Sequence, residues 1–205
     1  MNANHLPLHA LLLAAGRGSR FGGGKLQAEY RHRPLLTYPL ALIAAARNRG
    51  LVDGGYAVIP AHDEAVAGLV RGMKLETVLN SAPERGLSFS LQLGLTAMAA
   101  GGSAAALILL GDQPLVRLNV VEALISAWHA GGGAIIRPRY EASPDVPGHP
   151  ALLVRSAWPM VQELREDAGF GSLGSRLPET VVEVSGHNPD VDTLDDLRAL
   201  EVLHQ

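Results

Sequence analysis

The chain reads Leu13-Ala14-Ala15-Gly16-Arg17-Gly18-Ser19-Arg20-Phe21-Gly22-Gly23-Gly24-Lys25 at the end of its first apolar run. The glycines let backbone N–H groups turn toward an anion, because glycine has no Cβ in the way. Arg20 and Lys25 add fixed positive charges that neutralise what the amides leave uncompensated. A glycine-rich surface turn would explain the glycines but not the two cations. The stretch therefore predicts a phosphate-binding loop directly after a strand.

Apolar runs of strand length alternate with helix-like stretches along the whole chain. The expected strands are residues 10–15, 56–59, 75–79, 105–110, 134–136 and 180–184. The expected helices are residues 35–49, 63–72, 87–100 and 118–130, with Asp63 as a cap and Gly50 as a stop. The near-continuous apolarity of the first and fourth strands is typical of strands buried on both faces of a parallel sheet. The alternation predicts a three-layer α/β/α sandwich with a mostly parallel, Rossmann-like sheet.

The composition limits the class of protein. A length of 205 residues suits one domain over residues 1–205, and 47% hydrophobic with 18% charged residues is richer in apolar groups than a disordered chain. The net charge of −3 argues against binding to nucleic acid or to an anionic membrane. The absence of cysteine excludes disulfides and thiolate chemistry. Without a signal-peptide pattern or a long apolar span, a cytoplasmic enzyme is expected.

In this fold class, ligands bind at the carboxyl ends of the strands. There the chain carries residues 16–25 after the first strand and Gly111-Asp112-Gln113-Pro114 after the fourth. The dinucleotide fingerprint does not fit, because Phe21 stands where its third glycine belongs. The P-loop does not fit either, because it needs glycine at Ser19 and Ser or Thr at Leu26. The remaining pattern is L-A-A-G-x-G-x-R-x-G-x-x-K.

This pattern resembles the Gly-rich signature of nucleotidyltransferases of the sugar-nucleotide and molybdenum cofactor type, and the chain looks most similar to the molybdenum cofactor cytidylyltransferase family. The resemblance covers nearly the whole length. Four further segments resemble the family's motifs in the same order: Gly86-Leu87-Ser88-Phe89-Ser90-Leu91, Leu110-Gly111-Asp112-Gln113-Pro114, Gly148-His149-Pro150 and Asp190-Val191-Asp192-Thr193-Leu194-Asp195-Asp196-Leu197. The resemblance implies transfer of a nucleoside monophosphate from a triphosphate to a phosphate oxygen, with release of pyrophosphate.

The resemblance also assigns roles to individual residues. Arg20 and Lys25 would face the phosphates and act in catalysis together with Asp112. The acceptor would lie against Gly148-His149-Pro150. Two serines would contact the nucleotide, although each could instead cap or back-bond within its own helix. The nucleotide-binding residues implied in this way are Leu13, Ala14, Ala15, Gly16, Gly18, Ser19, Arg20, Lys25, Ser88 and Ser90.

Two carboxylates are the expected ligands of Mg²⁺ or Mn²⁺. Asp112 follows a buried strand, where a carboxylate can hold the ion while the nucleotide supplies further oxygens. The alternative role for Asp112 is a helix cap. By resemblance Asp192 is the second ligand, but Asp190, Asp195 and Asp196 lie close to it in sequence, and each could bind the metal or stabilise the terminal helix.

The choice of nucleotide base and of acceptor depends on single residues at which this chain differs from relatives in the same family. Relatives that use GTP typically have L-A-G-G, and the methyl group of Ala15 would narrow the base pocket, which favours CTP by about 1–3 kcal/mol. Cofactor-binding members often carry G-D-x-G-A-R, whereas this chain has Glu166-Asp167-Ala168-Gly169-Phe170-Gly171 and lacks the arginine. An arginine there would suit an anionic acceptor, and Arg176 is a possible substitute.

The resemblance therefore implies transfer of CMP from Mg-CTP to molybdopterin, with a molybdenum hydroxylase or its maturation factor as a further partner. One alternative keeps the reaction but changes its substrates, to GTP as donor or to a sugar phosphate, methylerythritol phosphate or phospholactate as acceptor. Another alternative is a non-catalytic protein that delivers the cofactor to a molybdenum hydroxylase.

Overall fold

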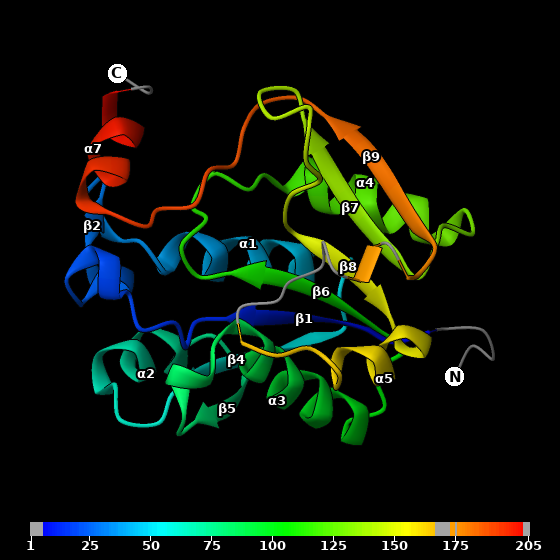
Figure 1. The fold of residues 1–205 in the computed structure, drawn as a ribbon, viewed down its shortest axis with the longest axis horizontal. Coiled ribbons are helices and arrows are strands. Elements are labelled where there is room, and N and C mark those ends of the chain that lie inside the picture. The colour runs from blue at the N-terminus through cyan, green and yellow to red at the C-terminus, as the bar shows by residue number, and fades with distance from the viewer. Residues whose placement is uncertain (1–5, 167–172, 175, 203–205) are drawn as a thin grey trace.

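A seven-stranded sheet forms the centre of the structure, a computed structural model that describes residues 6–166, 173, 174 and 176–202 (Figure 1). Within these residues the strand order is β5-β4-β1-β6-β8-β7-β9, and β8 runs antiparallel to both of its neighbours while the other pairs are parallel. The strands are β1 (Leu8–Leu13), β4 (Gly54–Pro60), β5 (Glu76–Asn80), β6 (Ala105–Leu110), β7 (Ile135–Tyr140), β8 (Ala151–Val154) and β9 (Glu179–Val184).

Helices cover both faces of the sheet. One apolar core joins α1 (Thr37–Asn48), α2 (Glu64–Arg71) and α4 (Leu118–His129) to one face. A second core joins α3 (Leu87–Ala100) and α5 (Trp158–Val161) to the other face. These layers confirm the expected α/β sandwich. No helix among the described residues is long and apolar enough to cross a membrane.

The strand β1 is apolar on both sides because each side meets a helix layer. Leu12 belongs to the core under α1 and α4, and Leu11 belongs to the core under α3. The helix α3 approaches β1 closely at Gly94, where an added Cβ would lie 2.5 Å from Leu11 Cδ1. A larger residue at this crossing would therefore have to displace the Leu11 side chain.

Two expected helix boundaries are confirmed. The side chain of Asp63 caps α2 by accepting a hydrogen bond from Val66 N at 3.0 Å. The helix α1 ends at Asn48, and Gly50 adopts a φ of +67°, which glycine tolerates without strain.

The sheet differs from the expectation at β7 and β8. No strand was expected at β8, and β7 extends through Tyr140 instead of ending at residue 136. Arg137 and Arg139 interrupt the apolar pattern of β7, but they form ion pairs with Glu179 and Glu183 of the neighbouring β9. The charged residues therefore stay within the sheet.

A third cluster attaches the carboxyl-terminal helix α7 (Leu194–Val202) to the glycine-rich loop. Phe21 of the short helix η1 (Ser19–Phe21) packs with Leu197 and Leu200 of α7 and with Tyr30 of the small hairpin. The hairpin consists of β2 (Glu29–Tyr30) and β3 (Arg33–Pro34). This cluster holds the loop and the end of the chain together on one side of the sheet.

Candidate active site

The loops that follow β1 and β6 lie side by side because these strands are parallel neighbours, with Leu13 opposite Leu110. The loop after β1 leads to η2 (Lys25–Gln27), and Asp112 follows β6. An open cavity of about 570 Å³ lies between the loops. Its walls are formed by Leu13, Ala14, Ala15, Gly16, Arg17, Gly18, Ser19, Arg20, Lys25, Leu26, Pro83, Glu84, Gly86, Leu87, Ser90, Leu110, Gly111, Asp112, Asp190 and Asp192.

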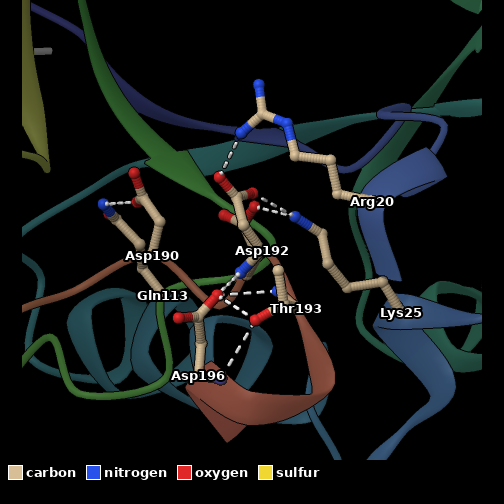
Figure 2. Close-up of polar contacts among 8 residues, drawn as sticks. Arg20, Lys25, Gln113, Asp190, Asp192, Thr193 and Asp196 are labelled. Atoms are coloured by element: carbon tan, nitrogen blue, oxygen red, sulfur yellow. Dashed lines mark hydrogen bonds and ion pairs between the residues drawn. The ribbon is translucent and has the colours of Figure 1, made fainter. Parts of the chain in front are cut away.

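Two cations of the loop contact two carboxylates at the cavity wall. Lys25 Nζ lies 2.6 Å from Asp112 Oδ2 and 3.1 Å from Asp192 Oδ1. Arg20 Nη1 lies 2.9 Å from Asp192 Oδ2 (Figure 2). Only 11% of the Lys25 side chain is exposed, against 77% of Arg20, so the lysine makes the better shielded contacts.

The environment of Lys25 keeps it protonated. Burial acts to lower the pKa of the ammonium, but the charges and hydrogen bonds of Asp112 and Asp192 outweigh it and raise the pKa above its ordinary value. Asp112 does not cap the following helix, since α4 begins at Leu118 with Arg117 before it. The carboxylate is thus directed to the cavity.

The acidic segment at the start of α7 divides its roles among its carboxylates. Asp196 accepts hydrogen bonds from Asp192 N, Thr193 N and Thr193 Oγ1, at 3.0, 2.7 and 2.8 Å (Figure 2). Thr193 Oγ1 in turn accepts from Asp196 N, which makes a reciprocal cap of the helix. The hydrogen bonds from Thr193 lower the pKa of Asp196. Asp195 pairs with Arg198 on the surface, and Asp192 faces the loop.

A third carboxylate, Asp190, also lines the cavity. Gln113 Nε2 donates to Asp190 Oδ1 at 2.6 Å (Figure 2). Withdrawal of the carboxyl group from solvent raises its pKa, the bond from Gln113 opposes this, and the charges of Asp112 and Asp192 raise the pKa further. Asp190 is therefore harder to ionise than an aspartate in free solution.

The geometry fits a divalent cation held by two protein carboxylates. The ammonium of Lys25 lies within ion-pair distance of both Asp112 and Asp192, so one cation can reach both groups. No cluster of three acidic, histidine or cysteine side chains suited to a metal occurs in the described part of the chain. Mg²⁺ commonly uses one or two carboxylates together with substrate phosphates and water, so two suffice.

The two candidate serines differ in position. Ser90 lines the cavity, and its Oγ accepts a hydrogen bond from Asn80 Nδ2 at 3.0 Å. Ser88 is buried outside the lining residues, and its backbone N–H donates to Glu166 O. Pro83 and Glu84 line the cavity as well. Sequence reasoning did not select these two, although they stand just before the Gly86 motif.

The predicted acceptor turn lies at the same edge of the sheet but outside the cavity lining. Since β8 is antiparallel, its first residue, Ala151, pairs with Ile108 near the carboxyl end of β6. The turn before it is fixed by Arg137 Nε donating to Gly148 O, and by Tyr140 Oη donating to His149 O at 2.8 Å. Burial, assisted by Arg137, lowers the pKa of His149 to about 4. The imidazole is therefore neutral near pH 7.

Part of the segment compared with G-D-x-G-A-R falls outside the described residues, which omit 167–172. Arg176, the possible substitute for its arginine, is described. Arg176 Nη2 lies 2.7 Å from Glu163 Oε2 in an exposed ion pair.

Comparison with known proteins identifies a family and two related proteins. A family model described as the MobA-like NTP transferase domain matches residues 10–181. A probable molybdenum cofactor guanylyltransferase from Thermococcus gammatolerans is 28% identical over 171 residues, which cover 82% of this chain and 80% of that protein. The bifunctional protein GlmU from Anaeromyxobacter dehalogenans is 34% identical over 66% of the chain, and the match spans 28% of its length.

A solved structure resembles the whole described fold. The crystal structure of Rv0371c from Mycobacterium tuberculosis H37Rv has a TM-score of 0.79 and 29% identity, and the match covers 97% of this chain and 99% of that one. A complex of the same mycobacterial protein with manganese has a TM-score of 0.77 and 26% identity, covering 96% and 98% of the two chains.

Proposed function

Because this chain belongs to the MobA-like NTP transferase family, we propose that it transfers CMP from CTP to a phosphorylated acceptor, with molybdopterin as the favoured acceptor, and releases pyrophosphate. The observation that carries the proposal is the contact of Lys25 with both Asp112 and Asp192 at the wall of an open cavity. Cations and paired carboxylates at this place suit a reaction in which an anion attacks a polyanion.

In the proposed reaction, an oxygen of the acceptor phosphate attacks the α-phosphorus of CTP. The new P–O bond forms while the bond from the α-phosphorus to the bridging oxygen breaks, and the electron pair leaves with pyrophosphate. Arg20, Lys25 and the backbone N–H groups of residues 16–24 bind and orient the triphosphate. The acceptor phosphate is already an anion, so the step needs no general base.

Asp112 and Asp192 would hold Mg²⁺ or Mn²⁺. When bound, such an ion supplies Lewis-acid stabilisation of the negative charge on the transferred and leaving phosphates. The two carboxylates contribute their position and their charge, which Lys25 and Arg20 balance in the free protein. The manganese complex of the mycobacterial relative supports a divalent cation in this family.

GTP is the second candidate donor. The Thermococcus relative named as a probable guanylyltransferase favours GTP. Ala15, which lines the cavity where relatives that use GTP typically have glycine, favours CTP. A methyl group discriminates by about 1–3 kcal/mol, so the two donors differ by a measurable rate ratio.

The test incubates the pure protein with each of the four NTPs, Mg²⁺ or Mn²⁺ and molybdopterin, and measures pyrophosphate. CTP-dependent release is the expected result, and release with GTP instead would assign the other base. Parallel reactions with a sugar phosphate, methylerythritol phosphate or phospholactate identify a different acceptor. Nucleotide binding without release under any of these conditions would favour cofactor delivery to a molybdenum hydroxylase over catalysis.

A further inference from the structure

Asn80 is a buried polar residue at the carboxyl end of β5, and its side chain points to the wall of the cavity. The residue has no exposed surface. Its Oδ1 accepts a hydrogen bond from Ala82 N at 2.8 Å, and its Nδ2 donates to Ser90 Oγ at 3.0 Å. Both ends of the amide are thus engaged in the interior.

These two contacts fix the orientation of the amide. Ala82 N is a backbone donor, so the amide atom beside it must be the oxygen. The amide nitrogen therefore faces Ser90, where the hydroxyl oxygen acts as the acceptor. A flipped amide would place two donors against each other at Ala82 and is excluded.

The direction of the Ser90 hydroxyl follows from this arrangement. A serine hydroxyl has one proton, and an oxygen that accepts from Asn80 must direct that proton elsewhere. Among the described residues, no carbonyl or side chain accepts a hydrogen bond from Ser90, although the residue is only 4% exposed. Because Ser90 lines the cavity, the proton is available to a ligand there.

The position of Ser90 indicates which part of a nucleotide it meets. Lys25 and Asp112, which contact each other, line the cavity from the segments that follow β1 and β6. Pro83 and Leu87 provide apolar surface on the segment that carries Ser90. Phosphates bind at charged walls and the faces of bases at apolar walls.

We propose that Asn80 is a positioning residue for nucleotide recognition, which holds the Ser90 hydroxyl as a donor toward a hydrogen-bond acceptor of the bound base, such as a ring carbonyl oxygen. Asn80 does not touch the nucleotide and acts through Ser90. This inference rests on the proposed function, because it takes a nucleoside triphosphate as the ligand of the cavity.

Asn80→Asp tests the direction of the hydrogen bond between Asn80 and Ser90. The substitution keeps the shape of the side chain but removes the Nδ2 donor. The carboxylate still accepts from Ala82 N but now also accepts from Ser90, which turns the serine proton away from the ligand. The expected result is a Kd for Mg-CTP about tenfold higher, with kcat at saturating CTP unchanged. The ratio of the Kd of Asn80→Asp to the Kd of the unmodified protein should decrease as the pH falls. The reason is that a protonated carboxyl group can donate to Ser90 again.

A double-mutant cycle separates positioning from a structural role. Ser90→Ala removes the hydroxyl, and adding Asn80→Asp to it should cause no further increase in Kd. Independent, multiplicative losses would overturn the proposal, as would an unchanged Kd in Asn80→Asp. The matched control is Gln92→Glu, the same amide-to-carboxyl change on α3 at a side chain that contacts Val161 O and Leu164 O away from the cavity. This variant should keep the Kd for Mg-CTP.

Binding and turnover are measured separately, so the two proposals can fail separately. If the unmodified protein binds Mg-CTP without releasing pyrophosphate, the cycle still decides the role of Asn80. If the same titration with GTP shows binding and that with CTP does not, the cycle is run with GTP. Absence of binding to all four NTPs would overturn both proposals.

Discussion

Asp112 lies 2.6 Å from the ammonium of Lys25, and its side chain is 19% exposed. Asp112→Asn keeps the size of the side chain but removes the charge that would hold a divalent cation. We expect pyrophosphate release to fall by about 100-fold or more, because a charge-stabilising group is lost at the reacting phosphates. The measurement is initial rate of pyrophosphate release, with circular dichroism as the test of folding.

Asp195→Asn is the matched control for this variant. Asp195 is a near neighbour of Asp192 in sequence, but its side chain pairs with Arg198 at the surface. The control should retain full activity. Wild-type rates in folded Asp112→Asn would contradict the metal assignment.

His149 predicts a component of the dependence of stability on pH. Its pKa is about 4 in the folded protein, against 6.5 for an exposed histidine, so the unfolded chain binds the proton first as the pH falls. The free energy of unfolding should therefore decrease between about pH 6.5 and pH 4, by up to about 1.4 kcal/mol per pH unit. Urea unfolding at several pH values measures this slope.

His149→Gln should flatten the slope in this window, because the titrating group is gone. His62→Gln makes the same substitution at an exposed turn residue and serves as the control. An equal slope in all three proteins would show that other groups carry the pH dependence.

Residues with a motif were predictable, and residues without one were not. The glycine-rich pattern selected Arg20 and Lys25, and the ends of the strands selected Asp112, all of which line one cavity. Asn80 belongs to no recognised spacing, and its importance depends on contacts with Ala82 and Ser90 that form only in the folded chain. Likewise, sequence left open which acidic residue caps α7.

At the scale of elements, the packing of α3 on β1 predicts a test of the sheet–helix contact. In Gly94→Ala the new Cβ would lie 2.5 Å from Leu11 Cδ1 and 3.0 Å from Val58 Cγ2. We expect a loss of about 1–3 kcal/mol in the free energy of unfolding, from overpacking of the core. Urea unfolding provides the measurement.

Gly68→Ala in α2 is the matched control, since a Cβ there meets nothing within 4 Å. It should stabilise the protein by about 0.5–1 kcal/mol, the usual gain of alanine over glycine in a helix. Similar effects of the two substitutions would contradict a special contact at Gly94.

Long periodic elements were easier to predict than short or charged ones. The expected ranges for β6 and α3 agree with the structure in full. The strand β8 has four residues, too few to show a period, and its place between β6 and β7 depends on pairing that is distant in sequence. Arg137 lies inside β7 because Glu179 neutralises it across the sheet, and a local pattern does not reveal such a partner.

For the whole molecule, removal of divalent cations should stop activity without loosening the fold. Chelation with EDTA should abolish pyrophosphate release and leave the Tm of the nucleotide-free protein unchanged, because Lys25 and Arg20 already pair with Asp112 and Asp192. Thermal unfolding with and without Mg²⁺ measures this.

In Lys25→Met, where the two carboxylates lose their ammonium, added Mg²⁺ should raise the Tm by mass action. A Tm that depends on Mg²⁺ in the unmodified protein would contradict the balance of charge described for these side chains. If added Mg²⁺ did not change the Tm of Lys25→Met, a cation site at Asp112 and Asp192 would be contradicted.

The pairing of Lys25 and Arg20 with the protein's own acids has a thermodynamic consequence. A bare nucleoside triphosphate meets cations that are already neutralised by Asp112 and Asp192, and it must compete with these carboxylates. A divalent ion that takes over the carboxylates frees both side chains for the phosphates. Metal and nucleotide should therefore strengthen each other's binding by the same factor, and the coupling makes the ion–nucleotide complex the species that the protein selects.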